Sequence, residues 1–293
     1  MASNLKWENV YCGKVRLILE PVMDTQPELS FLLELQELAE QCVMPFFKSR
    51  TLLVETKEDG SPATEADTAV ERLLRSNIQK LHPQHSILGE EFGTTTNPAS
   101  DWRWVIDPID GTRSFLRGNE TWAILIAVQF QQQTVMSAVS FPALGQRYHA
   151  VRGNGAHSSI SSYPLHVSTT PTLEHAVFSH SGFHGNPDLH PYEVFIRKCW
   201  DVRGLGNAFS HVAVARGTAD VALSLPFARL WDFTALDLLV TEAGGVFETA
   251  VHTPFTKGGA LSSNSILHEE AREILKPYLA SMDVTPVLAP PTE

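Results

Sequence analysis

Apolar residues recur along this chain at two spacings, one typical of helices and one typical of strands. Between residues 28 and 49 they fall at intervals of three and four, which predicts an amphipathic helix. The same spacing predicts a second helix over residues 67–81, with Asp67 in its first turn, where the helix dipole favours a negative charge. The stretch before this helix, residues 54–67, is rich in turn-forming residues and predicts a turn region.

Short apolar runs that stop at polar or turn-forming residues predict strands. Residues 86–91 (SILGEE) and 101–107 (DWRWVID) are two such runs, and both end in acidic residues. A short helix is expected over residues 112–116. Three further runs between residues 122 and 151 are separated by polar or Pro- and Gly-containing turns, which predicts an antiparallel meander.

The second half of the chain alternates strands and helices. Helices are predicted over residues 207–216, 232–243 and 268–279, and strands over residues 219–225, 246–250 and 260–266. Gly244 and Gly245 would close the second of these helices as its C-cap. The whole pattern predicts mixed α and β layers in two halves, residues 25–165 and 166–293, after an N-terminal extension of residues 1–24.

Composition narrows what such a chain can do. Its 293 residues, 43% of them hydrophobic and 19% charged, are typical of a globular protein with a large core. The formal net charge of -11, with no basic stripe, argues against nucleic acid or an anionic membrane as partner, so an anionic ligand would need cations. The three cysteines show no CxxC spacing, and no apolar run approaches the ~20 residues that cross a bilayer. These features predict a cytoplasmic protein and leave organellar targeting open.

Acidic residues gather where predicted strands end. They are Glu90 and Glu91, Asp107 and Asp110, and Asp232 after the tryptophan at 231. Carboxylates brought to one point repel one another and raise each other's pKa unless divalent cations neutralise them. Oxygen ligands of this kind select hard ions such as Mg²⁺ or Mn²⁺. The sequence therefore predicts a metal site at these strand ends.

The hexapeptide DPIDGT, residues 107–112, suits a metal site in detail. Pro108 is expected to stop the sheet ladder, so that the two aspartates turn toward one side of the loop. The freed carbonyl of Ile109 would be a further hard ligand. Gly111 and Thr112 would offer backbone N–H groups to an anion at the start of the short helix.

Each of these motifs alone also has a plain structural interpretation. Residues 90–91 could form an exposed acidic loop, DPIDGT an ordinary turn, and Asp232 a helix N-cap. Nothing structural requires a hard ligand at three strand ends. The conjunction therefore favours metal ions and, beside an anion cradle, a phosphate substrate.

Histidines and Trp122 are expected to be structural. His180 and His184 are four residues apart but lie among glycines, which predicts loop positions rather than metal ligands. His211 lies in an apolar helical stretch, which predicts a buried residue with its hydrogen bonds satisfied. Trp122 is predicted to lie in the core.

Four segments, in this order and spacing, carry a resemblance to a known family. They are TKEDGSPATEADTAVERLL, ILGEEFG, WVIDPIDGTRSFLRG and LWDFTALDLLVTEAGGVF. Over about residues 28–278 the chain resembles the inositol monophosphatase superfamily of Mg²⁺-dependent, Li⁺-sensitive phosphatases. The resemblance implies an α+β fold, a layered αβαβα sandwich of the inositol monophosphatase and fructose-1,6-bisphosphatase type. It also implies a homodimer with the active site between the two halves of each chain.

The resemblance further implies a ligand set for the metal ions. Glu90, Asp107 and the carbonyl of Ile109 would hold one Mg²⁺. Asp107, Asp110 and Asp232 would hold a second, and Glu90 would reach a third, weaker ion through water. Mn²⁺ could replace Mg²⁺ at such a site.

Other motif residues would then carry out the hydrolysis. Thr112, polarised by Asp67, would join Glu90 in activating a metal-bound water for in-line attack on phosphorus. The amides of Gly111 and Thr112 would hold the phosphate. Lys57 and Glu91 would support the site from nearby.

The second half is expected to select the phosphate ester. RGLGNAFSHVAVARG and LWDFTALDLLVTEAGG most resemble phosphatases of histidinol phosphate, an intermediate of histidine biosynthesis, with Arg203 and Asn207 as candidate substrate-binding residues. Those phosphatases usually have Asp where this chain has Asn207, so inositol phosphate or another sugar or cyclitol phosphate stays open. A bisphosphate would need a basic pocket, for which the second half offers only scattered basic residues. An inactive scaffold should have lost a metal carboxylate, and all are present.

Overall fold

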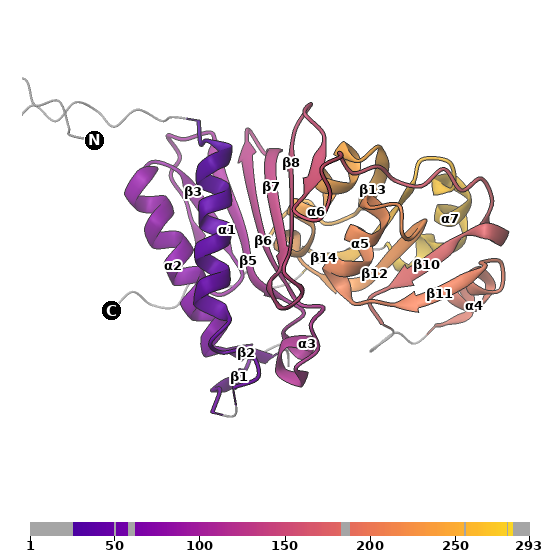
Figure 1. Cartoon of the computed structure of the whole chain (residues 1–293), viewed down its shortest axis with the longest axis horizontal. Coiled ribbons are helices and arrows are strands. Elements are labelled where there is room, and N and C mark those ends of the chain that lie inside the picture. The colour runs from indigo at the N-terminus through magenta and orange to yellow at the C-terminus, as the bar shows by residue number, and fades with distance from the viewer. Residues whose placement is uncertain are drawn as a thin grey trace, which may run out of the picture.

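The computed structural model describes residues 26–49, 51–57, 62–182, 188–254, 256–279 and 281–283. These residues form an α+β structure in which helices and two large sheets alternate (Figure 1). The layers are, in order, a helix pair, a sheet, a second helix pair, a second sheet and an outer helix pair. This αβαβα order confirms the predicted fold class.

The helices and strands of the described residues are as follows. The α-helices are α1 (Leu29–Val43), α2 (Glu65–Leu81), α3 (Thr112–Arg117), α4 (His190–Ile196), α5 (Asn207–Ala215), α6 (Leu230–Glu242) and α7 (His268–Leu275). The first sheet has the order β4-β3-β5-β6-β7-β8-β9, with β3 (Ser86–Gly89), β4 (Gly93–Thr95), β5 (Trp102–Asp110), β6 (Ala123–Phe130), β7 (Gln133–Phe141), β8 (Gln146–Val151) and β9 (Ala156–Ser158). The second has the order β11-β10-β12-β14-β13 with β15 beside β14, from β10 (Val177–His180), β11 (Asp201–Gly204), β12 (Val221–Ala228), β13 (Gly245–Thr249), β14 (Thr256–Asn264) and β15 (Ser281–Asp283).

The outer helices α1 and α2 cover one face of the first sheet because each has an apolar side. The predicted helix over residues 28–49 ends earlier, at Val43, and turns follow it. α2 begins after Thr64, whose hydroxyl accepts from the N–H of Ala66 at 3.1 Å. Asp67 accepts from the N–H of Thr64 at 2.8 Å, which completes a capping box and confirms its place in the first turn.

A short hairpin precedes α2 in the stretch that predicted only turns. β1 (Val54–Thr56) pairs antiparallel with β2 (Pro62–Thr64). All three residues of β1 are exposed, so no alternation of apolar and polar side chains marks it in the sequence. The pairing depends on the position of β2 beside α2, which sequence spacing does not show.

β5 is longer than predicted and contains a bulge. The ladder was expected to stop at Asp107, but Asp107 pairs with Leu125 and Asp110 pairs with Ala123 on β6. The residues between the two pairs on β5 outnumber those on β6, so the strand bulges there. Pro108 has no N–H to donate and lies in this bulge, where the ladder is interrupted rather than ended.

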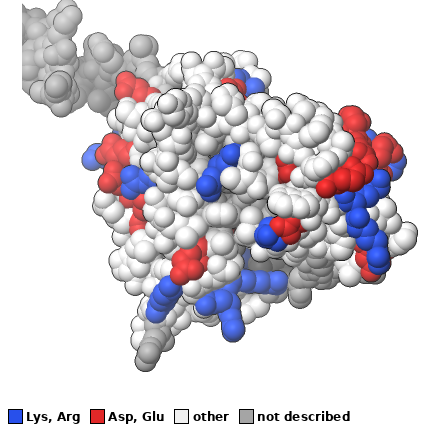
Figure 2. Space-filling model, turned by 45° about the vertical axis from the view of Figure 1, so that its right-hand side comes forward, with Lys and Arg blue, Asp and Glu red and all other residues white. Residues whose placement is uncertain are grey.

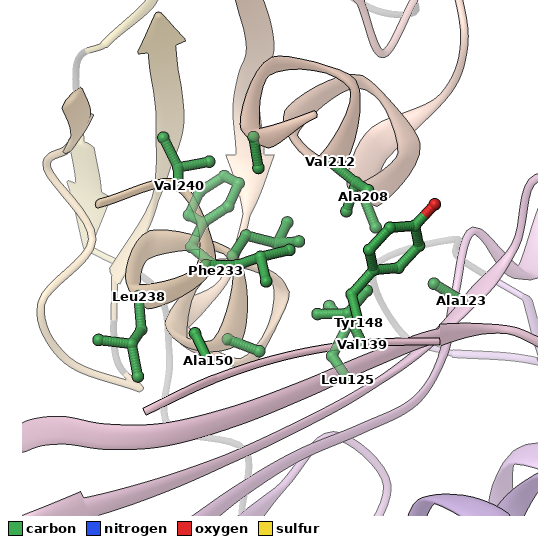
Figure 3. Packing of buried hydrophobic residues seen from close by; sticks show 14 of the residues in the cluster. Ala123, Leu125, Val139, Tyr148, Ala150, Ala208, Val212, Phe233, Leu238 and Val240 are labelled. Atoms are coloured by element: carbon green, nitrogen blue, oxygen red, sulfur yellow. The ribbon is translucent and has the colours of Figure 1, made fainter. Parts of the chain in front are cut away.

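The helices α5 and α6 form the middle layer between the two sheets. α6 buries residues on nearly all sides because a sheet lies on each of its faces. Figure 3 shows Leu125 and Tyr148 of the first sheet facing the middle layer, which contributes Val212 and Phe233. The chain passes from the first sheet to the second after β9, and the division at residue 165 stays a prediction.

Both residues assigned to the core are found there. His211 on α5 is fully buried, with its ring nitrogens 2.7 Å from Ser262 Oγ and 2.9 Å from Ser224 Oγ. Trp122 is also fully buried, and its ring centroid lies 5.0 Å from that of Phe115. His180 differs from the prediction because it ends β10 instead of lying in a loop, and His184 lies outside the described residues.

On the face shown in Figure 2, the charged side chains do not gather into one large patch of either sign. Figure 2 shows lysine and arginine side chains in separate small groups among acidic and uncharged residues. A continuous basic stripe, of the kind that follows a nucleic-acid backbone, is not seen on that face. Among the described helices, none is both long enough and apolar enough to span a bilayer.

Candidate active site

Three aspartates from two distant parts of the chain meet at one point. Asp107 and Asp110 lie in the last part of β5, and Asp232 lies in the first turn of α6. Each offers a carboxylate oxygen within 4.8 Å of the other two. Asp107 and Asp110 are buried, whereas Asp232 is partly exposed. The first sheet and the middle helix layer together build this acidic cluster.

Asp107 is the most enclosed member of the cluster. Its Oδ1 accepts from the N–H of Ile109 at 3.0 Å, across the bulge. Its Oδ2 is buried and has no hydrogen-bond partner among the described residues. Burial first, and then the carboxylates of Glu90, Asp232 and Asp110, raise the pKa of Asp107 well above its usual value. A buried carboxylate oxygen without a donor is unfavourable unless a cation approaches it.

Backbone amides of the second half hold the other two aspartates. Asp110 Oδ2 accepts from the N–H of Ala208 at 2.9 Å, at the start of α5. Asp232 Oδ2 accepts from the N–H of Arg229 at 2.5 Å, the capping contact of α6. Burial, followed by Asp110 and Glu90, raises the pKa of Asp232 well above its usual value. Asp232 is therefore both an N-terminal capping residue and a member of the acidic cluster.

Glu90 and Glu91 follow β3 and share one cation. The Lys57 ammonium lies 2.7 Å from Glu90 Oε1 and 2.6 Å from Glu91 Oε1. Burial acts to lower the pKa of Lys57, but attraction to the two carboxylates outweighs it and the pKa rises. Burial, and then the charge of Glu90, raise the pKa of Glu91 to about 7. Lys57 and Glu91 thus lie beside Glu90, where the supporting role predicted for them would require them.

Asp67 and Thr112 have different hydrogen-bond partners from those expected. Asp67 Oδ2 accepts from the Thr64 hydroxyl at 2.6 Å, because both residues belong to the capping box of α2. The Thr112 hydroxyl donates to the carbonyl of Ile109 at 3.3 Å. Burial raises the pKa of Asp67 to about 6, and its Oδ1 is buried without a partner among the described residues. The polarisation of Thr112 by Asp67 stays a prediction.

A cleft of about 550 Å³ opens beside the acidic cluster. Residues of both halves line it: Glu90, the Asp107 to Ser114 segment without Pro108, Ser181, Gly206, Arg229, Trp231 and Lys257 are among them. Gly111 has φ of 81°, a value that side chains rarely adopt, and it is the N-cap of α3. Gly111 and Thr112 both line the cleft, at the position where the sequence predicted a phosphate cradle.

The two predicted substrate-binding residues are placed differently. Arg203 lies on β11, is exposed and forms an ion pair with Asp201. Arg203 does not line the cleft of this chain. Asn207 is the first residue of α5 and follows Gly206, which lines the cleft, but its side chain lies outside the described part of the chain. The structure therefore does not bring Arg203 to the acidic cluster.

A buried ion pair beside this site was not predicted from the sequence. Glu71 and Arg75 on α2 lie one helical turn apart, and Arg75 Nε is 2.7 Å from Glu71 Oε1. Glu71 Oε2 also accepts from the N–H of Glu91 at 2.7 Å. The spacing of opposite charges by four residues was a visible signal, but such pairs also occur on exposed helix faces.

Known proteins are similar to this chain in sequence and in fold. Residues 24–280 match the model of the inositol monophosphatase family. The chain is 40% identical over 248 residues to a histidinol-phosphatase of Streptomyces coelicolor, covering 80% of this chain and 92% of that protein. It is 36% identical over 250 residues to a histidinol-phosphatase of Mycobacterium tuberculosis, covering 83% and 95%. The solved structure of a Thermotoga maritima IMPase has a TM-score of 0.75 at 26% identity, covering 85% of this chain and 97% of that one.

The family match and the site geometry agree. The matched residues include the first sheet, the second sheet except β15, the cleft and every member of the acidic cluster. The relatives are similar along nearly their whole length, so the likeness is not confined to one motif. The chain belongs to the inositol monophosphatase family and is a phosphoric monoester hydrolase.

Proposed function

We propose that this protein is a Mg²⁺-dependent phosphatase that hydrolyses histidinol phosphate to histidinol, a reaction of histidine biosynthesis. The observation that carries the proposal is the convergence of Asp107, Asp110 and Asp232 at a cleft between the two halves. The histidinol-phosphatases among the relatives support the choice of substrate.

The residues of the acidic cluster fit a hard divalent cation. The candidate donors are oxygen atoms, which Mg²⁺ and Mn²⁺ prefer. Asp107 Oδ2 is buried without a partner among the described residues, as expected of an atom that accepts a cation. Burial and then the neighbouring carboxylates raise the pKa of Asp107 and Asp232, so a cation bound beside them would stabilise their charged forms. The residues that would hold the ions are Glu90, Asp107, Asp110, Asp232 and the carbonyl of Ile109.

Residues of the chain would bind the phosphate and move the proton. When bound, Mg²⁺ would lower the pKa of a water molecule and neutralise charge on the phosphate. Glu90 would take one proton of the attacking water, the hydroxyl of Thr112 would accept a hydrogen bond from that water, and a second water would protonate the alcohol oxygen as the ester P–O bond breaks. Asp67 would accept from Thr112 through its Oδ1, which has no partner among the described residues. The amides of Gly111 and Thr112 would hold phosphate oxygens through the charge and direction of their N–H groups.

Inositol phosphate, or another sugar or cyclitol phosphate, is the alternative substrate. An uncharged Asn207 suits a neutral polyol better than the cationic amine of histidinol phosphate. The likeness to a Thermotoga maritima IMPase agrees with this alternative. Bisphosphates would need a second basic subsite. Arg113, Arg229 and Lys257 line the cleft and are the candidates for such a subsite.

A panel of phosphate esters tests the proposal. Phosphate release with Mg²⁺ would be measured from histidinol phosphate, inositol 1-phosphate, fructose 1,6-bisphosphate and 3'-phosphoadenosine 5'-phosphate. We expect the highest kcat/KM with histidinol phosphate. Highest activity on inositol 1-phosphate would support the alternative, activity confined to the bisphosphates would reject both, and no activity on any ester would indicate an inactive scaffold.

The variant Asn207→Asp tests how the second half selects the substrate. A new carboxylate near the amine of histidinol phosphate should raise kcat/KM for that substrate without raising it for inositol 1-phosphate. Equal kcat/KM values for variant and wild type would show that residue 207 does not meet the substrate.

The proposal extends to assembly, inhibition and location. We infer a cytoplasmic homodimer whose activity is inhibited by Li⁺. Light scattering would measure the mass in solution, and phosphate release at increasing LiCl, with NaCl as control, would measure inhibition. A monomer, or equal rates in both salts, would remove that part of the proposal.

A further inference from the structure

The buried pair of Glu71 and Arg75 lies against the segment that carries Glu90. The Glu71 side chain is 0% exposed and that of Arg75 is 10% exposed. Residues 89–93 (GEEFG) connect β3 to β4, and they pack on this pair. The hydrolysis proposed above uses neither member of the pair directly.

The Glu71 carboxylate binds backbone amides of the connecting segment. Its Oε2 accepts from the N–H of Glu91 at 2.7 Å, and its Oε1 accepts from the N–H of Phe92 at 3.2 Å. β3 ends at Gly89 and β4 begins at Gly93, so both amides lie in the turn between the two strands. Glu71 therefore supplies the acceptors that a neighbouring strand would supply elsewhere.

Arg75 binds the other end of the same segment. Its guanidinium donates to the carbonyl of Gly93 and, through Nη1 at 3.1 Å, to the Thr95 hydroxyl. Its Nε donates to Glu71 Oε1 at 2.7 Å, so the charge of each partner is met by the other. The guanidinium also lies 6.0 Å from the centre of the Phe92 ring. The two side chains thus hold consecutive parts of one turn.

Gly89 shows how closely the carboxylate fits. A Cβ atom placed on Gly89 would lie 2.0 Å from Glu71 Oε1, far inside contact distance. The carboxylate fills the space that a side chain at residue 89 would need. Its own hydrogen bonds prevent it from moving aside without releasing the turn.

Glu90 lies between Gly89, which packs against the Glu71 carboxylate, and Glu91, whose N–H donates to that carboxylate. Its N–H donates to the carbonyl of Ile106 at 3.2 Å, and its carboxylate is 2.7 Å from the Lys57 ammonium. We propose that Glu71 and Arg75 are positioning residues that hold the Glu90 carboxylate beside Asp107 and so set the affinity of the cluster for divalent cations. This inference rests on the metal site of the proposed function.

Mn²⁺ binding without substrate tests the inference. Calorimetry or electron paramagnetic resonance would give the Mn²⁺ dissociation constant of wild type, Glu71→Gln and Arg75→Gln. We expect it to rise about tenfold or more in both variants, as when other outer partners of metal ligands are removed. Folded variants with wild-type Mn²⁺ affinity would overturn the inference.

Arg72→Gln is the matched control. Arg72 lies on the same helix, 5.6 Å from the centre of the Phe92 ring, and donates no hydrogen bond to residues 89–93 within the described structure. Its removal should leave Mn²⁺ affinity unchanged. A loss equal to that in Arg75→Gln would assign the effect to helix charge and overturn the inference.

A measurement on the wild type keeps the test valid if the variants unfold. Hydrogen exchange of the metal-free protein should show slow exchange at the amides of Glu91 and Phe92, although they lie in a turn. Exchange as fast as at exposed loop amides would overturn the inference. Gly89→Ala, which displaces the carboxylate without removing it, should also weaken Mn²⁺ binding.

The outcomes separate this inference from the proposed function. If the wild type binds no Mn²⁺ and releases no phosphate, the proposed function and this inference both fail. If the wild type does both and the variants bind Mn²⁺ equally well, only the inference fails. A purely structural role would lower the amount of folded protein and leave the half-saturating Mg²⁺ concentration unchanged, whereas loss of Glu90 positioning should raise that concentration.

Discussion

Two groups of buried carboxylates lie close together in this protein, and they differ in how their charge is met. Glu71 accepts from Arg75 and from two backbone amides, so each of its oxygens has a donor. Asp107 in the acidic cluster accepts from one amide, and its Oδ2 has no partner in the described structure. Burial raises the pKa of both, but Arg75 opposes the rise at Glu71, whereas neighbouring acids add to it at Asp107.

The difference separates a structural carboxylate from a binding site. A buried carboxylate that pairs with an arginine of the same chain holds the neighbouring backbone in one arrangement, although desolvation of both ions offsets much of the attraction between them. Buried carboxylates without a counter-charge repel one another and lower the stability of the fold unless a cation binds. Such unfavourable arrangements are typical of functional sites. The acidic cluster therefore has the uncompensated charge expected of a cation site, and the Glu71–Arg75 pair binds the segment that carries Glu90.

Removing the central acid of the cluster should have the largest effect. Asp107→Asn should lower kcat for the best phosphate ester by about a thousandfold or more, because a metal ion contributes several kcal/mol of transition-state stabilisation. The same change should raise the stability of the metal-free protein, since it removes one of the mutually repelling charges. Phosphate release and urea unfolding in EDTA would measure the two effects.

Asp237→Asn is the matched control for this variant. Asp237 is also a largely buried carboxylate on α6 whose pKa burial raises, but it lies outside the cleft. It should retain most of the activity. If Asp107→Asn kept wild-type kcat, the acidic cluster would not be the site of hydrolysis.

Removing the cation of the other group should act on stability. Arg75→Gln leaves Glu71 buried without a counter-charge, and loss of one partner of a buried pair costs about 3–5 kcal/mol in the free energy of unfolding. Arg72→Gln, exposed on the same helix, should change it by less than about 0.5 kcal/mol. Urea unfolding would measure both changes. Equal losses of stability in the two variants would show that Arg75 contributes no more than an exposed arginine on the same helix.

The pH dependence of stability should differ between metal-free and metal-loaded protein. The pKa values of Asp107 and Asp232 are raised on folding, so their protonated forms favour the fold at low pH. This contribution is complete below the unfolded pKa of about 4 and is lost as pH rises through the folded values. Mg²⁺ at a hundred times its pH 5 dissociation constant should add about 2.7 kcal/mol at pH 5, and the same Mg²⁺ concentration should add more at higher pH because cations compete with protons.

Thermal unfolding from pH 5 to 8, in EDTA and in Mg²⁺, would measure this difference. We expect the two curves to separate as pH rises. Curves that stay parallel would show that the acidic cluster does not exchange protons for cations.

The meeting of the three aspartates could be predicted because each lies on a distinctive local motif. DPIDGT has a proline and a glycine at fixed positions beside two aspartates, and their chemistry limits what the loop can do. Buried strands and helices were likewise visible as apolar periodicity. These signals depend on neighbours in sequence, which the sequence shows directly.

What could not be predicted depends on neighbours in space. The contact of Asp110 with the amide of Ala208 joins the two halves. Asp67 accepts from the Thr64 hydroxyl, and the Thr112 hydroxyl donates to the carbonyl of Ile109. Glu71 has the sequence spacing of an ordinary surface pair, and only the packing of residues 89–93 makes it part of the site's frame. The exposed strand β1 has no periodic signal at all.

His211 extends the comparison to a buried base that has no counter-charge. It lies between two serine hydroxyls, and burial lowers its pKa to about 3. Between the unfolded pKa of about 6.5 and the folded value only the unfolded chain takes up the proton, so stability falls as pH decreases. At pH 5 the loss should be about 2 kcal/mol relative to pH 7.

His211→Gln should remove this loss, because glutamine offers the serines a donor and an acceptor but does not titrate. His175→Gln, at an exposed position, is the control and should keep the wild-type dependence. Urea unfolding at pH 7 and pH 5 in EDTA holds the contribution of the acidic cluster equal in all three proteins. If the stability of His211→Gln changed between pH 7 and pH 5 by as much as that of wild type, the buried imidazole would not contribute to the pH dependence of this protein.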